Sequence, residues 1–186
     1  NERGLTLSGI KANFLGGSTT IIGGSQRDGA MVIKAEGIVS SAGLRRTYQT
    51  PAMTRLSERI TGGTRFNATV SVKKKRPEII IESNLQGLAI DFPAPLRKTA
   101  NETLPLKFEL IGLPVDDGAV VRDEMKFTLG SAISARYTRQ KSAKKPGENA
   151  GLSGAASADA WRLVRGGIGV NVPAPEPDSG LIANVN

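Results

Sequence analysis

Apolar and polar residues alternate with a period of two along much of this chain. The clearest run follows Arg65, where Phe66, Ala68, Val70 and Val72 are each followed by a polar residue. Successive side chains of a β-strand point to opposite faces, so this spacing is typical of strands that hide one face from water. Similar runs recur between residues 5 and 172, and the 22 glycines and 10 prolines supply many turns. The pattern predicts a mainly β protein with a curved antiparallel sheet, either groove-like or sandwich-like.

Residues 41–60 depart from this alternation. Ser41 is placed to cap a first short helix, and Thr50-Pro51 offers an N-cap followed by the proline that helices favour at their first position. Apolar residues then repeat at the helical spacings of three and four, at Met53, Leu56 and Ile60. One or two short helices are therefore expected around residues 41–60.

Turns and loops separate the remaining strands. A hairpin is predicted with its turn at Lys73–Pro77 and its return strand at Glu78–Ser83. Residues 138–160 are rich in Lys, Gly, Ser and Ala, which is typical of a mobile loop. No apolar stretch is long enough to cross a bilayer as a helix. We expect residues 1–186 to form a single fragment of a longer β-rich body.

The side-chain chemistry argues against catalysis. The sequence has no Cys and no His, which removes thiol catalysis, thiolate zinc sites and the usual base of hydrolytic triads. The neighbouring acids Asp116-Asp117 and Asp123-Glu124 do not converge, because adjacent strand residues point to opposite faces. A sugar-cleaving enzyme would need two acids facing each other across a cleft, and the sequence gives no sign of them. We therefore expect no enzyme activity, no metal site and no cofactor.

The chain is basic, with 25 Lys and Arg against 17 Asp and Glu and a formal charge of +8. Its densest cationic run lies at the predicted hairpin turn: Lys73, Lys74, Lys75 and Arg76. A solvated turn is the favoured interpretation, followed by contact with lipid head groups or another polyanion. Nucleic acid is not expected as a partner, because no exposed aromatic residues are interleaved with these cations for base stacking.

A longer motif narrows the possibilities. Residues 83–100, SNLQGLAIDFPAPLRKTA, resemble a motif of the YhdP family with the form S-[DN]-L-x-G-L-[AS]-x-x-x-P-x-P-L-x-K-x-A. The matching residues are Ser83, Asn84, Leu85, Gly87, Leu88, Ala89, Pro93, Pro95, Leu96, Lys98 and Ala100. The following Leu104-Pro105-Leu106 also fits. The resemblance is strongest over about residues 36–113 and weaker over residues 114–186.

This resemblance implies a location and a function. The YhdP family and its AsmA-like relatives are long envelope proteins of Gram-negative bacteria, with one inner-membrane helix and a large periplasmic body. That body is similar to bridge-like lipid-transfer proteins and is implicated in moving phospholipid toward the outer membrane. The chain is therefore expected in the periplasm, as part of a parent protein anchored in the inner membrane. The family brings no catalytic residue or cofactor to carry over.

The expected role is to shield and conduct phospholipid acyl chains between the two membranes. The candidate lipid-facing residues are Phe66, Ala68, Val70, Val72, Ile79, Ile81, Leu106, Phe108 and Leu110, and the candidate head-group contacts are Lys73, Lys74, Lys75 and Arg76. A fragment of a continuous sheet is also expected to self-associate through its open edges. Taken without the resemblance, the alternation favours a closed sandwich, which would seal the apolar face. The alternative function is a scaffold module that binds anionic partners through basic loops.

Overall fold

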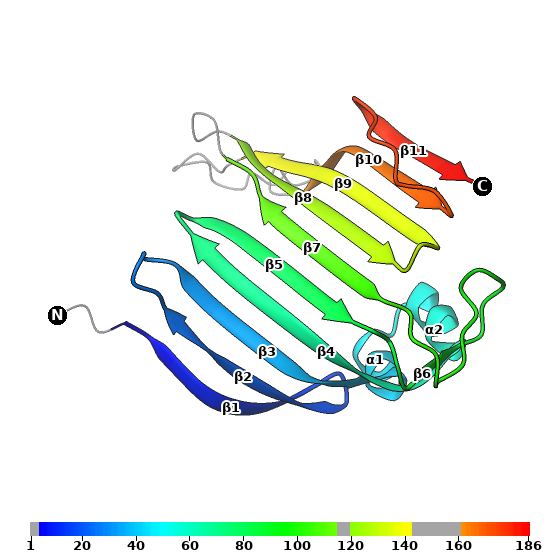
Figure 1. The fold of residues 1–186 in the computed structure, drawn as a ribbon. Helices are drawn as coiled ribbons and strands as arrows, with labels where there is room; N and C mark the ends of the chain where they lie inside the picture. Colours follow the sequence, from blue (N-terminus) through cyan, green and yellow to red (C-terminus); the bar gives the residue numbers. More distant parts are fainter. Residues whose placement is uncertain (1–3, 115–119, 143–160) are drawn as a thin grey trace, which may run out of the picture.

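The computed structural model describes residues 4–114, 120–142 and 161–186. In these ranges eleven strands and two short helices are present (Figure 1). The elements are β1 (Thr6–Phe14), β2 (Gly17–Ser25), β3 (Met31–Ser40), α1 (Ser41–Thr47), α2 (Pro51–Glu58), β4 (Ile60–Lys73), β5 (Arg76–Ser83), β6 (Leu88–Ile90), β7 (Leu106–Gly112), β8 (Val120–Leu129), β9 (Ile133–Ser142), β10 (Arg162–Val170) and β11 (Gly180–Val185).

The strands form one open, curved sheet in the order β1-β2-β3-β4-β5-β7-β8-β9-β10-β11 (Figure 1). Every pair along this path is antiparallel except β10 and β11, which run parallel. The short β6 pairs with the first residues of β4, off the main path. This confirms the predicted curved antiparallel sheet with short helices near residues 41–60. Across the described residues no second sheet packs over the first, so the groove-like form is present and the sandwich is not.

The helices begin close to where the sequence places them. Thr50 caps α2 by accepting a hydrogen bond from the Met53 amide, and Pro51 follows as its first residue, as predicted. The first helix is capped by Ser40 rather than Ser41: its Oγ accepts from the Gly43 amide while it donates to the Leu15 carbonyl. Ser40 can do both because it is the last residue of β3 and already lies against the β1–β2 turn.

Two boundaries differ from the sequence-based expectation. The loop predicted over residues 138–160 begins later, because β9 continues to Ser142 through ladder pairs with β8. The remainder of that prediction, residues 143–160, lies outside the described residues. The hairpin between β4 and β5 is also tighter than predicted, since Lys73 pairs with Arg76 and only Lys74 and Lys75 form the turn. A charged, flexible-looking composition therefore did not prevent strand pairing.

Burial is concentrated at the end of the strands where α1, α2 and β6 lie (Figure 1). The helices make their main contacts with β3 and β4. The buried side chains at this end include Ser41, Ser57, Thr64, Phe66, Leu85, Ile90 and Lys98. Elsewhere most described strand residues are half-buried or exposed. The sheet is thus a single layer that is supported at one end.

Candidate functional site

The ladder register collects apolar side chains on one face of the sheet. One row of cross-strand neighbours consists of Ile21, Ala35, Ala68, Ile81, Phe108, Phe127, Ala135, Ile168 and Ala183. The next row contains Ile33, Val70, Ile79, Leu110, Met125, Tyr137 and Leu181, with Gly166 between the last two. We call this surface the apolar face. Six of the nine residues predicted to face lipid lie in these rows, and the other three, Phe66, Val72 and Leu106, lie on the same face one row further out.

The apolar face is incompletely covered by the described protein. Its central residues are half-buried, and residues nearer its margins are more open: Val72 retains 38% of its surface, Ile10 47% and Leu181 55%. Soluble proteins normally bury a sheet's apolar side against a second layer. Among the described residues, the apolar face runs across the strands from β1 to β11 without such a layer.

The sheet bends toward this face near β1. The rings of Phe14 on β1 and Phe66 on β4 have centroids only 5.8 Å apart, although β2 and β3 lie between them. Neighbouring strands are about 4.8 Å apart, so the two backbones would be separated by roughly 14 Å in a flat sheet. The intervening positions Gly17 and Gly37 place no side chain between the rings. The contact therefore indicates a concave apolar face in this part of the sheet.

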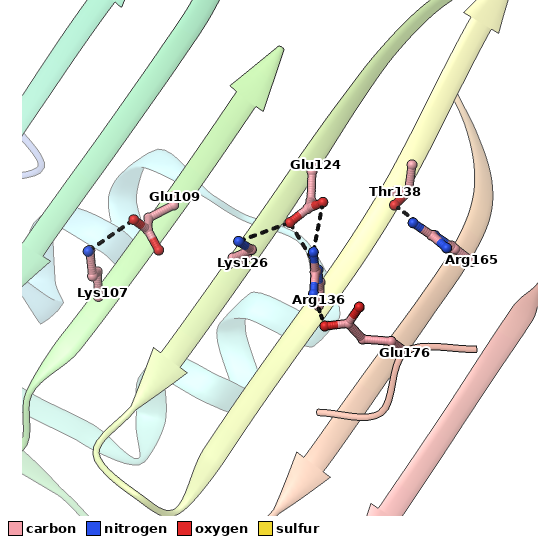
Figure 2. Close-up of polar contacts among 8 residues, drawn as sticks. All are labelled: Lys107, Glu109, Glu124, Lys126, Arg136, Thr138, Arg165 and Glu176. Atoms are coloured by element: carbon pink, nitrogen blue, oxygen red, sulfur yellow. Dashed lines mark hydrogen bonds and ion pairs between the residues drawn. The ribbon is translucent and has the colours of Figure 1, made fainter. Parts of the chain in front are cut away.

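The opposite face carries alternating charges. Lys107 Nζ lies 2.9 Å from Glu109 on β7, and Lys126 Nζ lies 3.1 Å from Glu124 on β8 (Figure 2). Arg136 on β9 donates to both oxygens of Glu124, at 2.9 and 3.2 Å, and also contacts Glu176. Burial alone would raise the Glu124 pKa, but the hydrogen bonds from Arg136 and Lys126 outweigh it and lower that pKa. We call this surface the charged face.

The neighbouring acids Asp123 and Glu124 show how completely the faces are separated. Glu124 joins the charged face, whereas Asp123 points to the apolar side and binds Arg139 at 3.0 and 2.7 Å. Adjacent acids therefore do not converge, as the sequence predicts. Asp123, Arg139 and Lys141 are the charged side chains that the register places on the apolar face of the described strands, and all three lie near one end of their strands.

That end forms a basic rim. It contains the β2–β3 and β4–β5 turns, the end of β7 and the start of β10. Lys73 is bound to Asp28, with Nζ 2.6 Å from Oδ2, and this contact lowers the Asp28 pKa. A hollow of about 410 Å³ opens nearby, lined by Lys74, Lys75, Arg76, Pro77, Gly112, Leu113, Pro114, Val121, Arg122, Asp123 and Trp161. Three of the four predicted head-group residues thus share one hollow, and Lys73 is engaged elsewhere.

Sequence reasoning did not find Arg122, Arg139 or Trp161. The Arg139 guanidinium lies 4.7 Å from the Trp161 ring centre, and Lys141 Nζ lies 5.5 Å from it. Hydrogen bonding to Asp123 raises the pKa of Arg139, although burial opposes its charged form. These residues are up to 40 positions apart in the chain, so only the register brings them together. A lone Trp beside a basic segment was the available signal.

The residues of the motif have a different place in the structure. They lie at the opposite strand end, where Lys98 Nζ donates to the carbonyls of Leu85, Leu88 and Thr99. Ser83 Oγ accepts from the Leu85 amide and donates to the Arg65 carbonyl, while the Gly87 amide donates to the Ala100 carbonyl. We call residues 83–105 the bracket. It fastens the ends of β4, β5 and β7, and none of its residues stands in the two rows of the apolar face.

Two features of the described ranges, residues 4–114, 120–142 and 161–186, bear on the site. No helix among them is long and apolar enough to cross a membrane. No group of three or more acidic, His or Cys side chains that could hold a metal ion is found in the same ranges.

The fold and the two faces define a class: open single-sheet β proteins with one apolar and one charged surface. The model of the YhdP protein family matches residues 1–183, and the chain belongs to that family. Family membership indicates a cell-envelope protein related to lipid transport. No curated protein and no solved structure matched the chain.

Proposed function

We propose that this chain is a non-enzymatic segment of a periplasmic conduit that conducts phospholipid between the inner and outer membranes. The observation that supports the proposal is the continuous apolar face, which runs across the strands from β1 to β11 without a covering layer among the described residues. Membership of a lipid-transport-related envelope family agrees with it. The parent protein would be anchored in the inner membrane, as the family resemblance implies.

The physical basis is the transfer of acyl chains from water to an apolar surface. Each methylene removed from water contributes about 0.8 kcal/mol. Rows of Ile, Val, Leu and Phe side chains would supply the contacts, and the bend near Phe14 and Phe66 would surround part of a chain. The charged residues of this face are confined to one strand end. Lipid could therefore slide from strand to strand between positions of nearly equal energy.

The two faces allow a test with matched variants. Ile79 and Leu110 are cross-strand neighbours on the apolar face, whereas Ile80 and Ile111 lie on the charged face of the same two strands. We expect wild-type protein purified from a Gram-negative host to carry phospholipid, detected by native mass spectrometry and lipid extraction. Ile79→Asn with Leu110→Asn should remove it, because polar amides would interrupt the acyl-chain contacts.

The control, Ile80→Asn with Ile111→Asn, should keep its lipid. Circular dichroism would show that both variants are folded. Equal lipid content in the two folded variants, or no uptake of added phospholipid by the wild-type protein, would contradict the proposal.

A further inference from the structure

The hollow on the basic rim has an unusual balance of charge. Among the described residues, four cations line it: Lys74, Lys75 and Arg76 at the β4–β5 turn, and Arg122 near the start of β8, whose strand position belongs to the charged face. Their side chains form no ion pair or hydrogen bond with the described residues. The one acid among the described residues that line the hollow, Asp123, is bound by Arg139 through two hydrogen bonds. The described part of this hollow is therefore electropositive and lacks an anion.

The hollow adjoins the apolar face. Pro77, Gly112 and Asp123 line the hollow, and the next residues on the same face of their strands are Ile79, Leu110 and Met125. Trp161, Val121 and Leu113 add apolar surface to the hollow itself. A ligand with an anionic end in the hollow would thus have its apolar part directed along the lipid-facing rows.

We propose that this hollow holds the phosphate of an amphiphilic lipid whose acyl chains lie on the apolar face. Phosphate oxygens accept strong hydrogen bonds from guanidinium and ammonium groups, which distinguishes this ligand from a neutral lipid. The proposal rests on the lipid-conduit function. It adds that the lipid head groups lie at the basic rim, by the β4–β5 turn and the end of β7, at the strand end opposite the bracket.

The backbone of the turn supports a role for its lysines. Lys74 and Lys75 have φ values of +50° and +63°, a left-handed conformation that costs energy for residues other than glycine and asparagine. Two-residue hairpin turns of this kind favour Asn-Gly. The variant Lys74→Asn with Lys75→Gly should therefore fold at least as well as the wild type, and its midpoint of urea unfolding should stay the same or rise.

The experiment compares three soluble probes by isothermal titration calorimetry: dihexanoyl phosphatidic acid, dihexanoylglycerol and glycerol 3-phosphate. The first has both phosphate and tails, the second only tails and the third only phosphate. We expect phosphatidic acid to bind at least about tenfold more tightly than either of the others. In the triple variant Lys74→Asn, Lys75→Gly, Arg122→Gln this advantage over dihexanoylglycerol should fall to about twofold. A charge control that also removes three cations, Lys34→Asn and Arg65→Asn on the charged face with Arg46→Gln on α1, should keep it.

Each result has a separate meaning. If dihexanoylglycerol binds and the triple variant leaves the affinity for phosphatidic acid unchanged, the head-group site is wrong and the conduit stands. If the charge control loses as much affinity as the triple variant, net charge rather than this hollow is responsible, and the site is again wrong. If glycerol 3-phosphate binds as tightly as the lipid, the hollow is a site for free phosphate. If neither lipid binds the wild-type protein, the conduit and the head-group assignment both fail.

Discussion

The bracket and the apolar face are built on opposite principles. In the bracket a single polar group makes several hydrogen bonds: the buried ammonium of Lys98 donates to three backbone carbonyls. On the apolar face no single residue is decisive, and the surface arises from one repeated side-chain preference along ten strands. The motif that resembles the family therefore specifies how the strand ends are fastened. The proposed lipid-binding function depends instead on the alternation of apolar and polar residues, a pattern that many sequences share.

This difference reflects what each region tolerates. The bracket contains close backbone approaches: a Cβ on Gly87, whose φ is +93°, would lie 2.3 Å from the Gly63 carbonyl oxygen. Such a position accepts only glycine. A half-buried position on the apolar face accepts any apolar side chain of suitable size. The motif residues of this chain therefore support the sheet and lie outside the two rows of the apolar face.

The largest expected effect comes from removing the Lys98 ammonium. Lys98→Met should lower the free energy of unfolding by about 4 kcal/mol. Three backbone carbonyls in the bracket would lose their hydrogen-bond donor, and water could not replace it at the buried ones. Burial also lowers the Lys98 pKa, although the charge of Glu102 opposes this. Urea unfolding monitored by circular dichroism measures the change.

Arg97 provides the control for this substitution. It is the neighbouring cation, and its side chain is 76% exposed. Its Nη2 atom lies 3.7 Å from Oδ1 of Asp91. Arg97→Met should change stability by no more than about 0.5 kcal/mol. Similar losses for the two variants would mean that the bracket does not depend on the buried ammonium.

A smaller effect should separate the two regions directly. Ile90 in the bracket is 8% exposed, whereas Ile79 on the apolar face is half-buried. Ile90→Ala should cost about 3 kcal/mol, since it leaves a cavity in packed surroundings. Ile79→Ala should cost about 1 kcal/mol in lipid-free protein, because less surface is transferred from water. Both values come from urea unfolding of delipidated samples.

The difference should narrow when phospholipid is present. A lipid that binds the folded state and covers Ile79 stabilises the wild-type protein more than the Ile79→Ala variant. Equal costs at the two positions without lipid would show that the apolar face is packed like an ordinary core, and would break the comparison.

The sequence predicts the local structure of this chain better than its long-range structure. Alternation placed the apolar side chains of β4, β5 and β7, and Thr50-Pro51 placed the start of α2, because both depend on neighbouring residues. The parallel pairing of β10 with β11 and the contact of Arg136 with Glu176 were not anticipated. Each feature brings together residues that are far apart along the chain. Their contact depends on how the whole sheet is arranged, so no local sequence pattern indicates it.

The candidate site divides in the same way. The run from Lys73 to Arg76 was visible as a cluster in the sequence, but its division was not: Lys73 binds Asp28 from a turn 45 residues earlier, while the next three residues line the hollow. Arg122 joins that hollow from β8, and Trp161 joins it from the position just before β10. Local composition identified the basic turn, and only the register of the sheet identified its partners.

The smallest expected effect concerns the charged face and its dependence on pH. Because the Glu124 pKa is lowered in the folded state, the unfolded chain binds the proton more readily, and stability must fall as the pH drops through that lowered pKa. The contribution is fully present above the ordinary Glu pKa of about 4.3. At pH 7, Glu124→Gln should therefore lower the free energy of unfolding by about 1 kcal/mol through its weakened bonds to Arg136.

Below the lowered Glu124 pKa the two proteins should become nearly equal, since protonated Glu124 and Gln are then both uncharged. Glu36→Gln, at an exposed position on the same face that forms no ion pair with the described residues, should give a curve parallel to that of the wild type. Urea unfolding at several pH values provides the curves. A pH-independent difference between Glu124→Gln and wild type would mean that packing around Glu124, and not its charge, supports this face. The charged face would then resemble the apolar face in resting on side-chain contact area alone.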